Sequence, residues 1–323
     1  MGGTLFDTFS AKEKQFFWER TQILAQALEE WMRGYSCMRP VRIPLLALLT
    51  AMTSPHVPAP DVIGGEKMAL WIFGIDDLAD ERRVSLADFL EKGERWCQSA
   101  RDGKDSGGEN DELTTMILEI RQDIERFRLS EPLLDRWVSG VSRVVEAMAQ
   151  EYRYALLFNT EGDQALPSLG EYLNEGLYSL GLPLWSTVIW ITQDDPSILA
   201  QIELIDVATR HASRATRLYN DLRTFDKEMA EGNVNSVMIA YYKVLADHEV
   251  PPESGLAEAK RYILQLADFF GRECYTLLKQ IHTESGQVEE TLSRLVAFHS
   301  YFYGRSEHDY HITSLSNIQT LLK

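Results

Sequence analysis

The sequence predicts an all-α fold, and three observations support this prediction. Apolar residues recur mostly at three- and four-residue steps, which is the spacing of one helix face. Strand-like alternation is scarce, and no internal repeat or low-complexity tract interrupts the pattern. Gly, Pro and polar clusters divide the chain into segments of helical length, which we place at 11–33, 42–52, 62–80, 85–101, 112–128, 131–158, 168–192, 197–229, 233–247, 256–283 and 287–303.

Turn-forming residues mark the ends of the first predicted helices. The Pro-rich segment 53–60 ends one helix, and Asp61 is placed to cap the next one. Segment 102–111 collects Gly, Asp and Ser residues and is the best candidate for a surface loop.

The helix predicted at 168–192 should be distorted in its middle. Pro183 has no N–H, and its ring crowds the carbonyl of Ser179, so that carbonyl loses its helical partner. Because the flexible Gly181 lies between these two residues, we expect a kink there. A Pro kink without a functional role is the alternative explanation.

Length and composition limit the class of protein. A chain of 323 residues with 45% hydrophobic residues is long enough to bury a sizeable core. No apolar run reaches the roughly 18 residues of a membrane span, and segment 1–6 lacks the basic and apolar regions of a signal peptide. We therefore expect a cytoplasmic protein without a membrane span.

The charge balance argues against polyanionic partners. The chain has 32 Lys and Arg residues against 49 Asp and Glu residues, a formal net charge of −17 at pH 7. Binding to nucleic acid or to acidic membranes depends on clustered Lys and Arg, so neither is expected. A small phosphorylated substrate remains compatible with this balance when metal ions reverse the local charge. The isolated Cys37, Cys97 and Cys274 lack the spacing of a zinc site or a disulfide framework.

An acidic cluster ends the apolar helix predicted at 62–80. Asp76 and Asp80 are four residues apart, and Asp77 and Asp80 are three apart, so we expect all three carboxylates on one edge of the helix. Like charges at a helix C-terminus oppose the macrodipole, and bound cations would compensate them. The cluster therefore predicts a metal site, although such a cluster is weak evidence by itself in an acidic protein.

A second polar stretch lies within the helix predicted at 197–229. Asn220, Thr224 and Glu228 follow one another at steps of four residues, which places amide, hydroxyl and carboxylate oxygens in one stripe. Mg²⁺ prefers oxygen ligands and usually keeps waters and substrate phosphates among them. The stripe is therefore suited to holding an ion against a phosphorylated substrate. A solvated helix face is the alternative for this stripe considered alone.

Together the two stretches resemble the paired metal-binding motifs of class I terpene synthases, and the chain looks like their bacterial single-domain members. Segment 76–80 matches the DDxxD motif, and segment 220–228 matches (N,D)D-x-x-(S,T)-x-x-x-E. The resemblance implies one α-helical barrel domain over 1–323, because a boundary at 102–111 would separate the two motifs. It also implies three Mg²⁺ ions that bind a substrate diphosphate, with the metal ligands Asp76, Asp77, Asp80, Asn220, Thr224 and Glu228.

The resemblance gives the expected kink a function. In this family the corresponding helix is broken and a backbone carbonyl at the break points at the substrate; Leu180 and Gly181 match these linker and effector positions. The chain departs from the pattern nearby, since Gly176 and Leu177 stand where many bacterial members carry an Arg that senses the diphosphate. That sensor is also missing in relatives that act on pre-cyclised, labdane-type diphosphates.

Other side chains are candidates to bind the diphosphate. Arg217 and Lys227 lie on the same predicted helix as the polar stripe, although intrahelical salt bridges, such as Lys227 with Glu231, are the alternative. The adjacent Arg-Tyr pair that is usual near the C-terminus of the family is absent, and we take Arg305 and Tyr310 as its substitutes.

Aromatic side chains are expected along the cavity wall. Phe73 lies one turn before the acidic cluster, and Trp185 follows the kink. Ring faces stabilise a carbocation by about 0.5 to 2 kcal/mol each. Packing in the hydrophobic core is the alternative for either ring.

The sequence thus predicts a Mg²⁺-dependent cyclase that ionises an allylic prenyl diphosphate, with C20 geranylgeranyl diphosphate favoured, and cyclises the carbocation. The alternatives are a sesquiterpene synthase that uses farnesyl diphosphate, a class I synthase that uses a bicyclic labdane-type diphosphate, a chain-elongating prenyltransferase and a non-catalytic helical binding protein. No Gly-rich phosphate loop, nucleophile elbow or Rossmann fingerprint supports another chemistry. A homodimer is compatible with the sequence.

Overall fold

The structure is a computed structural model that describes residues 5–80, 83–106, 111–244, 252–305 and 312–322. All regular elements within these ranges are helical, which confirms the predicted all-α class. The longer α-helices are α1 (Ala11–Met32), α2 (Ile43–Thr53), α3 (Ala59–Asp80), α4 (Leu86–Asp102), α5 (Glu112–Ile124), α6 (Ser130–Glu161), α7 (Leu169–Ser179), α8 (Leu182–Gln193), α9 (Ile198–Glu231), α11 (Pro252–Leu278) and α12 (Gln287–His299).

Short helical segments connect these helices and follow the last of them. They are η1 (Leu5–Thr8), η2 (Pro40–Arg42), η3 (Gly162–Ala165), α10 (Ser236–Ile239), the π-helical turns η4 (Ala240–Val244) and η6 (Ser300–Arg305), and α13 (Leu315–Leu322).

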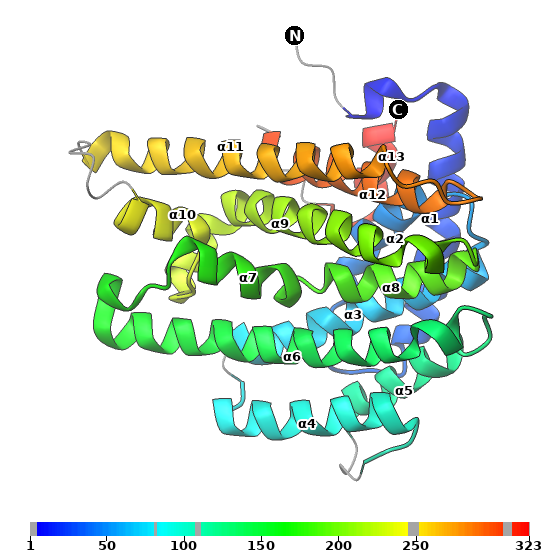
Figure 1. Cartoon of the computed structure of the whole chain (residues 1–323), viewed down its shortest axis with the longest axis horizontal. Coiled ribbons are helices and arrows are strands. Elements are labelled where there is room, and N and C mark those ends of the chain that lie inside the picture. Colours follow the sequence, from blue (N-terminus) through cyan, green and yellow to red (C-terminus); the bar gives the residue numbers. More distant parts are fainter. Residues whose placement is uncertain (1–4, 81–82, 107–110, 245–251, 306–311, 323) are drawn as a thin grey trace.

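The long helices lie side by side (Figure 1). In the order α6, α7 and α8, α9, α11, each packs against the next, and α4 covers the outer side of α6. Behind this layer, α3 packs against α6 and α8. This arrangement brings the end of α3, the second half of α6 and the second half of α9 around one cavity.

Local sequence signals explain where several helices begin and end. Ser10 and Ser168 start α1 and α7 with capping boxes, in which the Ser hydroxyl accepts the N–H of the Glu three residues later and that Glu accepts the N–H of the Ser. Gly232 ends α9 in the left-handed conformation, with φ of 73°. These caps satisfy the backbone groups that helix ends leave without partners.

Several predicted boundaries were wrong. The segment 168–192 forms two helices, α7 and α8, rather than one kinked helix. Asp61 lies inside the first turn of α3, which begins at Ala59, and therefore does not cap that helix. Helix α13 was not predicted; it packs against α1 and α2, and its Ile318 and Leu322 are buried. Part of the helix predicted at 233–247 lies outside the described residues.

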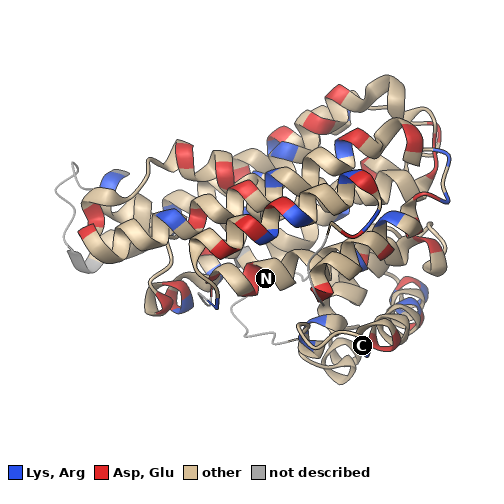
Figure 2. Ribbon diagram, turned by 90° about the horizontal axis from the view of Figure 1, so that it is seen from below, with Lys and Arg blue, Asp and Glu red and all other residues tan. Residues whose placement is uncertain are grey.

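The fold bears on three further expectations. No helix in the described ranges is long and apolar enough to cross a membrane. Figure 2 shows acidic and basic residues interspersed along the helices that are seen in that view. All three cysteines are free thiols, as expected from their spacing.

Candidate active site

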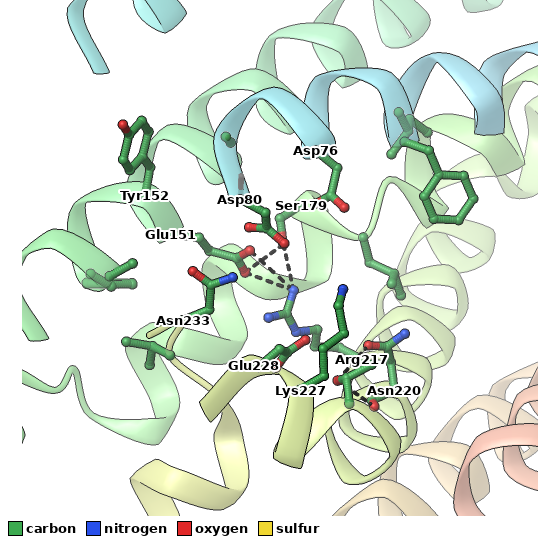
Figure 3. Close-up of a pocket in the computed structure, with 18 of the residues that line it drawn as sticks. Asp76, Asp80, Glu151, Tyr152, Ser179, Arg217, Asn220, Lys227, Glu228 and Asn233 are labelled. Atoms are coloured by element: carbon green, nitrogen blue, oxygen red, sulfur yellow. Dashed lines mark hydrogen bonds and ion pairs between the residues drawn. The ribbon is translucent and has the colours of Figure 1, made fainter. Parts of the chain in front are cut away.

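A cavity of about 210 Å³ lies between the end of α3 and the second half of α9 (Figure 3). Helices α6 and α7 form its other walls, and residues 233–234 close one side. Most of the predicted site residues line it. The lining consists of Arg42, Ile72, Phe73, Asp76, Ala79, Asp80, Glu151, Tyr152, Tyr154, Ala155, Tyr172, Ser179, Leu180, Arg217, Asn220, Thr224, Lys227, Glu228, Asn233 and Val234.

The wall formed by α3 carries two of the three predicted carboxylates. Asp76 and Asp80 are one turn apart and both line the cavity, as the four-residue spacing predicts. Asp77 does not line it. The expectation that all three carboxylates converge on one edge is therefore wrong for Asp77, because each residue advances about 100° around a helix and Asp77 meets a different neighbour.

Asp77 instead joins α3 to the start of α2. Its two oxygens accept N–H groups from both terminal nitrogens of Arg42, at 2.9 and 2.7 Å, and Arg39 approaches one of them at 3.1 Å. The carboxylate is buried, with 7% of its side chain exposed, so these charges compensate it inside the protein. The bidentate pair with Arg42 gives Asp77 a structural role, and its predicted role as a metal ligand stays a prediction.

The opposite wall carries the predicted polar stripe of α9. The Thr224 hydroxyl donates to the Asn220 carbonyl at 2.9 Å and lies 3.3 Å from the Asn220 amide oxygen, so these two side chains are in contact. One turn later, Glu228 accepts an N–H from Asn235 at 2.6 Å. All three stripe residues line the cavity opposite the carboxylates of α3.

Asn235 is a positioning residue that the sequence reasoning missed. It is fully buried and caps α10 by accepting the N–H of Val237. Its amide group also donates to the Asp221 carbonyl at 2.9 Å and to Glu228, so it ties the loop after α9 back onto the polar stripe. Its place shortly after Gly232, which ends α9, could have predicted that Asn235 caps the next helix. Its contact with Glu228 depends on the tertiary structure and could not be read from the sequence.

The cavity has an excess of negative charge. Burial raises the pKa of Asp76 above its usual range, and repulsion by Glu151 adds to this shift. Burial likewise raises the pKa of Asp80, with Asp76 as the next cause, and that of Glu228, with Asp221 as the next cause. Bound cations would remove these penalties, because they favour the ionised carboxylates.

The arrangement of these oxygens suits a metal ion that is shared with a substrate. No group of three or more His, Cys, Asp or Glu side chains among the described residues forms a ready metal cage. Asp76 and Asp80 lie on one wall, while the stripe of α9 lies on the other. Each wall therefore offers only some of the ligands that a divalent ion needs. Such a site suits an ion that takes its remaining ligands from water and from the phosphate groups of a substrate.

Arg217 is the most strongly held cation at the cavity, with 12% of its side chain exposed. It forms ion pairs with Asp221 at 2.9 Å and with Glu151 at 3.0 Å, so the alternative of an intrahelical salt bridge is realised in part. It also donates to the hydroxyls of Tyr172 and Ser179. Of these partners, Glu151, Tyr172 and Ser179 were not predicted, because nothing in their spacing links α6 and α7 to α9.

Lys227 lies on the rim of the cavity. Its side chain is 69% exposed and its amine is 3.6 Å from Glu231, the salt bridge considered from the sequence. In Figure 3 its amine points into the same space as Arg217. Because it is exposed, that ion pair holds it weakly, and Lys227 is free to turn towards a bound anion.

The break between α7 and α8 is formed by Leu180 and Gly181. Gly181 adopts φ of 74°, and a Cβ there would lie 2.4 Å from the Cδ1 of Ile72, so any other residue would be strained and would have to displace Ile72. Leu180 lines the cavity, but Gly181 does not. The Gly181 carbonyl accepts the N–H of Trp185 at 2.9 Å, so it begins the hydrogen bonding of α8 rather than pointing freely at the cavity.

The two predicted aromatic residues have different surroundings. Phe73 lines the cavity, and the guanidinium of Arg42 lies 4.5 Å from its ring centroid. Trp185 is buried in the core and is not part of the lining, so this ring follows the alternative of packing in the hydrophobic core. The Arg305 side chain and Tyr310 lie outside the described residues, so their predicted role stays a prediction.

Comparison with known proteins identifies the class. Residues 67–267, more than half of the chain, match the family described as "Terpene synthase family 2, C-terminal metal binding". A segment of 135 residues is 31% identical to "Bifunctional cis-abienol synthase, chloroplastic" of Abies balsamea. That segment is 41% of this chain and 14% of the Abies protein, so the chain spans only a small part of that protein's length.

Solved structures share the fold. The linalool/nerolidol synthase of Streptomyces clavuligerus, in complex with 2-fluorogeranyl diphosphate, is 16% identical with a TM-score of 0.63, and the match covers 86% of this chain and 91% of that one. The abietadiene synthase of Abies grandis is 15% identical with a TM-score of 0.66, over 96% and 40% of the two chains. The isoprene synthase of grey poplar, Populus x canescens, is 14% identical with a TM-score of 0.66, over 96% and 57%.

The fold and the cavity define a helical enzyme whose acidic walls suit divalent metal and a diphosphate. The chain belongs to the terpene synthase family, whose matched region is its metal-binding part. Membership of this family implies the use of divalent metal in general.

Proposed function

We propose that this enzyme is a Mg²⁺-dependent terpene cyclase that acts on geranylgeranyl diphosphate and works as one catalytic domain over 1–323. The observation that carries the proposal is the pair of facing walls, with Asp76 and Asp80 on α3 and the stripe of Asn220, Thr224 and Glu228 on α9. When bound between these walls, Mg²⁺ ions, three by analogy with the family, would neutralise the diphosphate and stabilise it as a leaving group.

The chain's own residues would perform the remaining tasks. Asn220, Thr224 and Glu228 would hold Mg²⁺ that binds the diphosphate end of the substrate, and Lys227 is placed to donate to the diphosphate oxygens from the rim. Ile72, Phe73 and Leu180 present apolar surface beside this polar end, where the prenyl chain would lie. A water-poor cavity lets the alkenes of the substrate trap the cation before solvent does.

A bicyclic, labdane-type diphosphate is the second candidate substrate. One observation favours it: Gly176 stands where a diphosphate-sensing Arg is usual, and the stem of Arg217 lies across it. The cavity of about 210 Å³ is smaller than the roughly 300 Å³ at which ligand pockets begin, so either C20 substrate requires side chains that line the cavity to move.

Product analysis separates these candidates. The protein is incubated with Mg²⁺ and C10, C15, C20 or bicyclic C20 diphosphate, and the hydrocarbons and alcohols are identified by gas chromatography and mass spectrometry. We expect a cyclic C20 product from geranylgeranyl diphosphate. Turnover of C15 alone would reject the C20 assignment, and a requirement for isopentenyl diphosphate would indicate chain elongation.

A further inference from the structure

The donors of Arg217 are already committed within the protein. Its Nε donates to the Tyr172 hydroxyl at 3.0 Å and faces Asp221, and one terminal nitrogen also donates to Tyr172. The other terminal nitrogen contacts Ser179 at 3.2 Å and Glu151 at 3.0 Å. Because each of its three nitrogens has a protein acceptor, Arg217 cannot offer two parallel N–H groups to a diphosphate without releasing a partner.

Glu151 is the partner best placed for release. Asp221 is fully buried and is also held by the Tyr172 hydroxyl at 3.0 Å and the Ser236 N–H at 3.1 Å. Glu151, by contrast, lines the cavity, and its side chain is 19% exposed. Figure 3 shows the carboxylate of Glu151 facing the guanidinium of Arg217 among the lining residues, so a diphosphate in the cavity has access to this ion pair.

Glu151 also holds the end of α7. Its carboxylate accepts the Ser179 hydroxyl at 2.7 Å, and Ser179 is the last residue of α7 before the break. Arg217 donates to the same hydroxyl, so each of these three groups, the guanidinium, the carboxylate and the hydroxyl, contacts the other two. Any movement of Arg217 away from Glu151 consequently changes the contacts of the residue that precedes the break.

We infer that Glu151 is a positioning residue that competes with the substrate diphosphate for Arg217 and links this exchange, through Ser179, to the break between α7 and α8. This inference rests on the proposed function. A diphosphate carries more negative charge than one carboxylate and so displaces Glu151 from Arg217. Glu151 then keeps Ser179 as its remaining donor and holds the end of α7 in place during turnover.

Substitution of Glu151 tests the competition directly. We expect Glu151→Gln to bind inorganic diphosphate about fivefold more tightly at saturating Mg²⁺, measured by titration calorimetry, while its kcat falls. Opposite changes in affinity and kcat distinguish a competing residue from one that only supports the fold. Weaker or unchanged diphosphate binding in this variant would overturn the inference.

Two variants separate contact from charge. Glu151→Asp keeps the charge but shortens the side chain, so it should also bind diphosphate more tightly if the contact with Arg217 matters; wild-type affinity would assign the effect to the charge alone and contradict the inference. Glu146→Gln, on the same helix, removes an exposed carboxylate that pairs with Arg143 at 3.7 Å and should leave both measurements unchanged.

Ser179→Ala tests the link to the break. It leaves the ion pair of Glu151 with Arg217 in place but removes the hydroxyl that joins Glu151 to the end of α7, so the ratio of cyclic product to linear alcohol should fall. An unchanged product ratio would show that Ser179 transmits nothing. Because inorganic diphosphate binding does not depend on the identity of the prenyl chain, these binding tests remain valid if the proposed C20 substrate is wrong.

Discussion

The stem of Arg217 crosses directly over Gly176, so that a Cβ on Gly176 would lie 3.3 Å from the Cγ and 3.6 Å from the Cδ of Arg217. Gly176 is one of the two positions, with Leu177, at which the family resemblance leads us to expect a sensing Arg, and the stem of Arg217 from α9 fills the space beside it. The departure from the family pattern at position 176 and the placement of Arg217 are two parts of one packing arrangement.

Gly176→Ala should weaken diphosphate binding. The added methyl group is tighter against Arg217 than ordinary van der Waals contact, so the guanidinium must shift by a few tenths of an ångström and its hydrogen bonds lose alignment. We expect an increase of about threefold to tenfold in the Kd for inorganic diphosphate with Mg²⁺. Gly170→Ala, also on α7, meets no atom within 4 Å and is the control. Equal effects of the two substitutions would disprove the packing argument.

The neighbouring residues Asp76 and Asp77 should respond differently to loss of charge. Asp76→Asn removes a carboxylate from the cavity and should abolish Mg²⁺-dependent diphosphate binding without lowering the melting temperature. Asp77→Asn removes the charge that compensates Arg39 and Arg42 and replaces one of its two acceptor oxygens by an NH₂ group, so it should cost about 1 to 3 kcal/mol of stability. Calorimetric titration and thermal unfolding of both variants test this contrast. Loss of Mg²⁺-dependent binding in Asp77→Asn would restore Asp77 as a metal ligand.

Gly181→Ala should alter the products. An Ala at φ of 74° is strained, by roughly 1 kcal/mol, and its Cβ would also displace Ile72 from the cavity wall. We expect a changed product mixture together with a small loss of stability. Gly286→Ala has a similar backbone, with φ of 67° and ψ of 4°, but meets no atom within 4 Å, so it carries the strain without the collision. If it changes the products equally, the contact with Ile72 is irrelevant.

Buried Glu66 should make stability depend on pH. It is fully buried on α3, and burial raises its pKa to about 8, against the lowering effects of Thr50 and Arg20. The Glu66 carboxyl ionises near pH 4.5 in the unfolded chain and near pH 8 in the folded protein. The contribution of this group to the free energy of unfolding is therefore fully present below pH 4.5. It is lost as the pH rises from 4.5 to 8, by up to about 5 kcal/mol.

Glu66→Gln removes this penalty. We expect the melting temperature of Glu66→Gln minus that of the wild type to be larger at pH 8.5 than at pH 5, because only the wild type must bury a charge at high pH. Thermal unfolding at the two pH values measures the difference. An equal difference at both values would show that Glu66 has an ordinary pKa in the folded protein.

The sequence alone determined the features that depend on local geometry. Helical periodicity predicted most of the helices, and steps of four residues correctly placed Asp76 with Asp80 and Asn220 with Thr224 and Glu228. The missing N–H of Pro183 correctly marked the break, although its extent was underestimated. Such features follow from bonds and contacts within a few residues, so they are readable without knowledge of the rest of the chain.

Only the tertiary structure decided which neighbour each side chain meets. Asp77 is adjacent to Asp76 in sequence, yet it faces Arg42 because α2 packs against that side of α3. Glu151 carries no motif, and it enters the site because α6 packs beside α7. Arg217 is held by partners from three helices whose spacing is set by the packing of large side chains over the whole core. Helical periodicity gives the direction of a side chain, whereas the packing of the helices determines what lies there.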